Sequence, residues 1–125
     1  MSDLRDNFSE SVIGLGIEVY RALGPGLLES AYEECLRFEL KHAGIEFCRQ
    51  VPLPIIYKSV KLECGYRMDI VVAERLVIEL KTVEKLLPVH EAQMLTYLRL
   101  GSLRAGLLLN FHAPVLKDGI KRLVL

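Results

Sequence analysis

Two acids and a lysine in neighbouring apolar segments are the part of this sequence best suited to chemistry. Asp69 lies in a predicted strand over 62–72, and an acid among apolar side chains is costly unless it is paired, hydrogen-bonded or bound to a metal. Side chains alternate along a strand, so Glu79 and Lys81 share one face of a second predicted strand over 76–83. Carboxylate oxygens of this kind suit a hard cation, Mg²⁺ or Mn²⁺.

The link between these two strands decides whether the acids meet. Only residues 73–75 separate the strands, which predicts an antiparallel hairpin. If the hairpin is centred on Glu74, Asp69 lies opposite Glu79 with Cβ atoms about 5 Å apart. Two carboxylates at that distance repel, so the pairing needs a positive charge between them. A divalent cation meets this need, and so does Lys81 alone in a structural ion cluster. A register shift by one residue would remove the site.

A helix predicted over 28–43 brings a further acid toward its apolar side. Glu29 lies within about 20° of both Leu36 and Leu40 around the helix axis. Alternatively, Glu29 only complements the helix dipole near an exposed helix end. The remaining charged residues of this helix form a row that we expect to face solvent, consisting of Glu33, Arg37 and Lys41.

A third predicted helix, over 88–100, carries a polar stripe. His90, Gln93 and Tyr97 share one face because they are spaced by three and seven residues. The stripe could contact a substrate. His90 could equally be a surface residue at the helix start, with Gln93 in solvent and Tyr97 at the edge of the core.

The elements that must position these residues follow the order α-α-β-β-β-α-β-(β). This order predicts an α/β (α+β) chain with a mixed sheet covered by helices. No linker or repeat divides it, so we expect one domain over 1–125. The predicted helices span 8–23, 28–43 and 88–100, and the predicted strands span 47–57, 62–72, 76–83 and 105–111. Residues 119–125 form either a last strand or a short terminal element.

The composition predicts a folded protein whose charge is unevenly distributed along the chain. The chain has 125 residues, of which 51% are hydrophobic and 26% charged, so it can form a core and is not disordered. The net charge is zero, but residues 1–57 carry 5 basic and 9 acidic groups and residues 58–125 carry 11 and 7. A polyanion should therefore prefer the second half.

The cysteines and the N-terminal residues indicate the cellular compartment in which the protein is expected. Three widely spaced cysteines without a CxxC pair make a disulfide framework or a zinc site improbable, and we expect buried, reduced thiols. Residues 1–7 are polar and unlike a signal peptide, and no apolar run approaches the ~20 residues that span a bilayer. We expect a soluble, cytoplasmic protein.

Several motifs in this sequence resemble those of a known family. Asp69 followed by Glu79-Leu80-Lys81 resembles the bipartite motif of the PD-(D/E)XK nuclease superfamily. Residues 26–32 match GxxExxY, the motif that names one bacterial and archaeal family of that superfamily. Further similar segments lie at 50–58, 93–98, 106–111 and 120–123.

The resemblance implies a restriction-endonuclease-like αβββαβ core with a central mixed sheet. It implies metal ligation by Asp69 and Glu79, with the Leu80 carbonyl as a further oxygen and Glu29 completing the site. Lys81 becomes the catalytic lysine that positions or activates the attacking water. The usual proline before the aspartate is replaced by Met68.

The third helix also enters this resemblance. Gln93 and Tyr97 resemble the QxxxY element that lines the active site of RecB-like exonuclease domains. Gln93 thus joins the catalytic set, and Tyr97 and His90 join Gln93 as expected substrate-binding residues.

The function expected from these residues is Mg²⁺-dependent hydrolysis of phosphodiester bonds in DNA, with Mn²⁺ as a possible substitute. The alternatives are a non-catalytic nucleic-acid- or protein-binding module on a nuclease fold, and an RNA-directed nuclease. The small size of the chain also suggests a homodimer.

Overall fold

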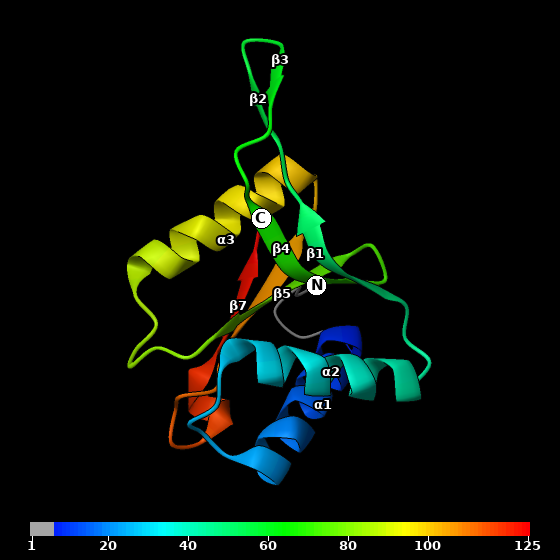
Figure 1. Cartoon of the computed structure of the whole chain (residues 1–125), viewed down its shortest axis with the longest axis vertical. Coiled ribbons are helices and arrows are strands. Elements are labelled where there is room, and N and C mark those ends of the chain that lie inside the picture. The colour runs from blue at the N-terminus through cyan, green and yellow to red at the C-terminus, as the bar shows by residue number, and fades with distance from the viewer. Residues whose placement is uncertain (1–6) are drawn as a thin grey trace.

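The chain forms a five-stranded mixed sheet with helices on both faces (Figure 1). The computed structural model describes residues 7–125, and the polar segment 1–6 lies outside the described residues. The helices are α1 (Asn7–Leu23), α2 (Glu29–His42) and α3 (Pro88–Gly101), and a short 3₁₀ helix, η1, spans Leu116–Gly119. The strands of the main sheet, in spatial order, are β1 (Phe47–Pro52), β4 (Arg67–Val72), β5 (Leu76–Lys81), β6 (Ala105–Asn110) and β7 (Ile120–Val124).

The strand directions follow from the lengths of the connections. Strands β4 and β5 are joined by a three-residue turn and pair antiparallel, as do β1 with β4 and β6 with β7. Strands β5 and β6 pair parallel, because α3 lies between them in sequence and carries the chain back across the sheet. The predicted restriction-endonuclease-like architecture is confirmed.

The helices divide between the two faces according to their apolar rows. Helices α1 and α2 cover one face, where Leu36 and Leu40 pack with Ile78 and Leu80 in one core cluster. Helix α3 covers the other face, where its apolar side chains pack against Val77. Strand β5 is thus buried on both sides, and its alternate residues point into different cores.

Two predicted strands are interrupted where the sequence contains proline or glycine. The strand predicted over 47–57 breaks at Leu53 and Pro54, and the one predicted over 62–72 breaks at 63–66. Pro52 ends the edge strand β1, and neither Pro52 nor Pro54 has a backbone N–H to donate to a longer ladder. Beyond the break the chain forms a separate two-stranded sheet, β2 (Ile55–Tyr57) with β3 (Val60–Leu62), whose base is joined by a hydrogen bond from the Leu53 amide to the Tyr66 carbonyl (2.9 Å).

Two further expectations concern the surface. All three cysteines are free, as expected, but Cys48 and Cys64 are exposed and Cys35 is half-buried, so the prediction of buried thiols was wrong. Cys48 lies on the edge strand β1 and Cys64 lies in the link between β3 and β4, where little packs over them. Within residues 7–125, no helix is both long and apolar enough to cross a membrane.

Candidate active site

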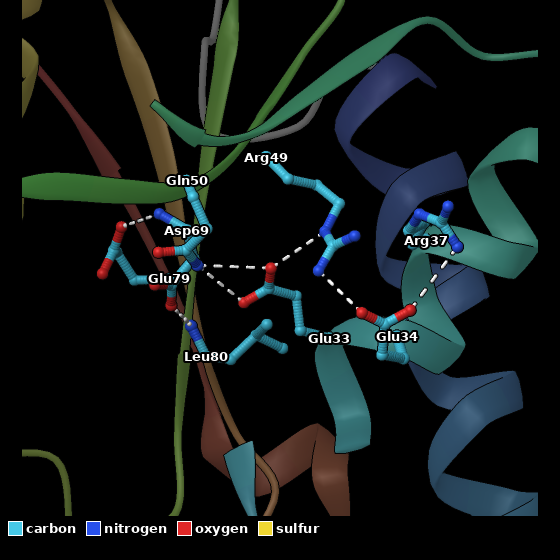
Figure 2. A network of polar contacts seen from close by, with 8 residues as sticks. All are labelled: Glu33, Glu34, Arg37, Arg49, Gln50, Asp69, Glu79 and Leu80. Carbon is cyan, nitrogen blue, oxygen red and sulfur yellow. Dashed lines mark hydrogen bonds and ion pairs between the residues drawn. The ribbon is translucent and has the colours of Figure 1, made fainter. Parts of the chain in front are cut away.

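The acid pair lies where strands β4 and β5 separate. The hairpin has the predicted register, with Ile70 opposite Ile78 as the last regular pair. At the next position, the Asp69 amide donates to Glu79 Oε2 (2.8 Å) and the Leu80 amide donates to Asp69 Oδ2 (2.9 Å) (Figure 2). The carboxylates thus replace the ladder hydrogen bonds, and each keeps a second oxygen for another ligand.

Burial makes this pair electrostatically unstable as two anions. Glu79 is 6% exposed, and this desolvation, reinforced by the nearby Asp69 charge, raises its pKa to about 8. Burial also raises the pKa of Asp69, against the hydrogen bond from the Leu80 amide. The Lys81 ammonium acts on both acids in the opposite direction, but burial outweighs it. The pair therefore favours a proton or a cation.

Glu29, the first residue of α2, contacts the chain just after the end of β5 and has no hydrogen bond to Asp69 or Glu79. Its Oε2 accepts hydrogen bonds from the Thr82 amide (3.1 Å) and the Thr82 hydroxyl (3.3 Å). Its charge acts on both Asp69 and Glu79. The first residue of α2 is thus tied to the residue that follows Lys81.

The exit of β5 is fixed by a buried asparagine. Asn110 is 2% exposed, and its side chain accepts from the Val83 amide (3.1 Å) and donates to the Val83 carbonyl (2.8 Å). The Phe111 amide donates to the Lys81 carbonyl (2.8 Å). These bonds hold the backbone of Lys81 while its side chain stays partly exposed. Asn110 was not among the predicted site residues, although it is a polar residue at the end of a buried apolar strand and lies in the family-like segment 106–111.

The residues of the GxxExxY segment hold the start of α2. Gly26 has a φ of +108°, a conformation that residues with a side chain rarely adopt. The buried Tyr32 hydroxyl donates to the Gly24 carbonyl (2.6 Å) and accepts from the Leu27 amide (3.1 Å). Its ring stacks on Phe111, 4.3 Å between centroids. The loop before Glu29 is therefore held to the core by one side chain.

Substitution of Gly26 tests this role. We expect Gly26→Ala to lower the free energy of unfolding by about 1–2 kcal/mol, because alanine must adopt a strained φ. The matched control is Gly14→Ala on the exposed side of α1, where an added Cβ meets nothing within 4 Å. Gly14→Ala should stabilise the protein by up to about 1 kcal/mol. Equal destabilisation of both variants in urea titrations would contradict the assignment.

Glu33 is buried, and the prediction that it faces solvent was wrong. It is 7% exposed and accepts hydrogen bonds from Arg49 Nε (3.0 Å) and from Gln50 Nε2 (3.0 and 3.2 Å) (Figure 2). Glu33 lies only about 20° from Leu40 around the helix axis, so the same helical geometry that placed Glu29 could have found it. Its partners come from β1, which no pattern within α2 predicts.

The β1–β4 ladder is interrupted beside this contact. Arg49 pairs with Ile70 and Val51 pairs with Met68, and the position between them is left unpaired. Gln50, at that position, has a φ of +51° and directs its amide to Glu33. The negative charge of Glu33 also contributes to the raised pKa of Asp69. Glu33 is therefore a second acid from α2, after Glu29, whose charge acts on Asp69.

Replacing Glu33 should be costly to stability. We expect Glu33→Gln to lower the free energy of unfolding by about 1–3 kcal/mol, because Arg49 loses a charged partner in a half-buried place. Glu34→Gln is the control, since Glu34 also binds Arg49 (2.7 Å) but its side chain is 54% exposed. It should cost less than about 0.5 kcal/mol. Similar melting temperatures for the two variants would contradict the difference in burial.

The polar stripe of α3 divides into two parts. His90 Nδ1 accepts a hydrogen bond from the Leu87 amide (2.9 Å) and so caps the start of α3. Gln93 Nε2 donates to the Tyr97 hydroxyl (3.2 Å), and Tyr97 is 6% exposed. Burial, followed by the charges of Glu79 and Asp69, raises the pKa of Tyr97. The charges of the acid pair thus reach Tyr97, while His90 has a structural role at the helix end.

Comparison with known proteins agrees with this geometry. The family model described as the PD-(D/E)XK nuclease superfamily matches residues 6–123. The chain belongs to this superfamily. Searches of curated proteins and of solved structures find no significant match.

The PD-(D/E)XK motif accounts for the residues at the β4–β5 separation. Asp69, Glu79 and Lys81 occupy its positions, and Met68 stands in place of the proline. Within residues 7–125, no three His, Cys, Asp or Glu side chains are arranged to hold one metal ion together. The two carboxylates nevertheless fit a divalent cation, because their free oxygens are hard donors and their mutual repulsion needs a positive charge.

Proposed function

We propose that this PD-(D/E)XK protein is a Mg²⁺-dependent nuclease that hydrolyses phosphodiester bonds of DNA. The observation that supports this most strongly is the pair of half-buried Asp69 and buried Glu79, linked across the separated strands, with Lys81 two residues further along β5 from Glu79. Two like charges this close, one of them buried, destabilise the fold, and groups placed at such a cost are typical of functional sites.

The proposed ligands are the free oxygens of Asp69 and Glu79, with the Leu80 carbonyl as a main-chain donor. Glu29 would complete the site from the start of α2, from which it already acts on both acids. Mn²⁺ has similar ligand preferences and could replace Mg²⁺. When bound, such a cation makes water more acidic and neutralises charge on the phosphate.

Lys81 is the proposed catalytic lysine. Its backbone is fixed by the Phe111 amide, and its partly exposed ammonium lies near both acids. In this position it can orient the attacking water or stabilise the charge that develops on the phosphate.

The α3 residues are proposed to contact the substrate. Gln93 and Tyr97 share a hydrogen bond, and the charges of the acid pair reach Tyr97, which suits a group that orients a phosphate or a water. His90 is proposed for substrate binding through the ring nitrogen that does not cap α3. We further propose that the chain belongs to the GxxExxY family, because each residue of the motif has a structural role. Gly26 adopts a positive φ, Glu29 accepts hydrogen bonds from Thr82, and the Tyr32 hydroxyl donates to the Gly24 carbonyl.

A cleavage panel tests the proposal. Purified protein and an Asp69→Ala variant would be incubated with single- and double-stranded DNA and RNA, in Mg²⁺, Mn²⁺ or EDTA. We expect DNA cleavage that requires the metal and is absent from the variant. RNA cleavage alone would make the protein an RNA-directed nuclease. Binding without cleavage under all conditions would favour a non-catalytic module.

A further inference from the structure

The small sheet formed by β2 and β3 exposes an apolar face. We call residues 53–67 the ribbon; its two strands, β2 and β3, project beyond the main sheet, and Arg67 at its end is the first residue of β4 (Figure 1). Ile55 pairs with Leu62 and Tyr57 pairs with Val60, so these four side chains share one face. Tyr57 is 58% exposed and Val60 is 54% exposed. An isolated two-stranded sheet is marginally stable, and an exposed apolar face of this kind marks an interaction site.

The charges of the ribbon indicate the kind of partner. The ribbon holds three basic residues and one acid, whereas the rest of the chain has 13 basic and 15 acidic residues. Its tip is a turn in which Lys58 and Ser59 both have positive φ, and Lys58 Nζ lies 5.4 Å from the centre of the Tyr57 ring. Lys61 Nζ forms an ion pair with Glu63 Oε2 at 3.6 Å. The ribbon therefore combines an apolar, aromatic face with a local positive charge, which favours an anionic partner that has flat apolar groups.

The ribbon is continuous with the candidate active site. Tyr66, 44% exposed, packs edge-on against Tyr97 with 6.3 Å between ring centroids. Tyr97 accepts the hydrogen bond from Gln93, packs in the core cluster that contains Val77 of β5, and feels the charges of Glu79 and Asp69. The chain passes from Tyr66 directly into β4, where Asp69 follows three residues later, about 10 Å along a strand. A polymer bound on the ribbon could thus extend to the acids.

We propose that the ribbon binds unpaired nucleotides of the substrate, with the Tyr57 and Tyr66 rings stacking on bases and Lys58 and Arg67 contacting phosphates. This inference rests on the proposed nuclease function and adds a substrate class to it: single strands, or duplexes with an unpaired region.

Two features favour unpaired nucleotides over an intact duplex. Base faces are available for stacking only where the bases are unpaired, and stacking on aromatic side chains is how single-strand-binding proteins hold their ligands. Duplex affinity comes chiefly from many Lys and Arg contacts to phosphates. The ribbon offers few of these, and the chain as a whole has no net charge.

Binding assays without turnover test the proposal. Fluorescence anisotropy in EDTA would compare a labelled single strand, a blunt duplex and a duplex with a single-stranded overhang. We expect the single strand and the overhang to bind more tightly than the blunt duplex. Tyr57→Ala should weaken their binding by about tenfold or more, and Tyr57→Phe should retain it. Lys58→Ala should reduce the dependence of affinity on salt.

Ile56→Ala is the matched control, because Ile56 is 61% exposed but lies on the opposite face of the ribbon, beside Lys61. It should bind as the unchanged protein does. Circular dichroism would verify that each variant is folded. The proposal is overturned if Tyr57→Ala binds single strands normally, or if Tyr57→Ala only converts a dimer to a monomer, which would mean that a second copy covers the ribbon.

Cleavage by the same proteins in Mg²⁺ separates this proposal from the nuclease function. Cleavage unaffected by Tyr57→Ala, together with unchanged binding, would refute the ribbon and leave the nuclease. Ribbon-dependent binding of single strands without cleavage of any substrate would refute the nuclease and leave the ribbon.

Discussion

Glu79→Gln is expected to abolish cleavage and, at the same time, to stabilise the metal-free protein at alkaline pH. The pKa of Glu79 is raised to about 8, above the ordinary value of 4.5 in the unfolded chain, so folding takes up a proton between these values. The free energy of unfolding therefore falls as the pH rises through this window, by a few kcal/mol. Glutamine keeps the shape of the side chain and carries no charge.

Thermal melts in EDTA at several pH values would measure this effect. The melting temperatures of Glu79→Gln and the unchanged protein should agree near pH 4.5 and diverge steadily up to about pH 8. Glu84→Gln is the control, because Glu84 is exposed in the loop after β5 and should shift the curve little. If the melting temperatures of Glu79→Gln and the unchanged protein differed by the same amount at every pH, ionisation of Glu79 would not destabilise the folded protein.

Lys81→Met is expected to separate catalysis from metal binding. Lysine is not a ligand in the proposed site, so the variant should still gain thermal stability when Mg²⁺ or Mn²⁺ is added. Its cleavage rate should fall by about 10²–10³-fold, because charge on the phosphate loses a fixed positive partner. Asp69→Asn should lose both cleavage and the metal-induced shift in melting temperature.

Lys85→Met serves as the control for this experiment. Lys85 lies in the exposed loop after β5, so its replacement removes the same charge without approaching the acid pair. It should retain cleavage and the metal-induced shift. If Lys81→Met cleaved as fast as Lys85→Met, the role assigned to Lys81 would be wrong. If Lys81→Met lost the metal-induced shift, the lysine would be needed to assemble the metal site.

The parts of the fold that depend on local pattern could be predicted from the sequence. The short turn around Glu74 fixed the β4–β5 register, and alternation along 76–83 assigned Val77 and Ile78 to different faces. The strand predicted over 47–57 was too long, because a run of alternating apolar residues continues across Pro54 although the backbone ladder cannot. The separate β2–β3 sheet was therefore not foreseen.

The candidate site was predictable in its centre and not in its surroundings. Asp69 and Glu79 meet because one hairpin carries both, which is local information. The bond between Glu33 and Arg49 joins α2 to β1 across a bend of the chain. Such contacts depend on how a helix settles on a sheet, which periodicity does not specify. The role of Asn110 depends likewise on the parallel pairing of β6 with β5.

The hydrogen bond between Leu53 and Tyr66 at the base of the ribbon makes the ribbon a separable unit. The chain leaves and returns at neighbouring points, so insertions, deletions or exchange of residues 54–65 leave the paths of β1 and β4 unchanged. If the ribbon binds the substrate as proposed, related proteins could diverge in which nucleic acid they prefer while keeping the same acid pair. For engineering, a ribbon from another such protein could be grafted between Leu53 and Tyr66 to redirect specificity without rebuilding the chemistry.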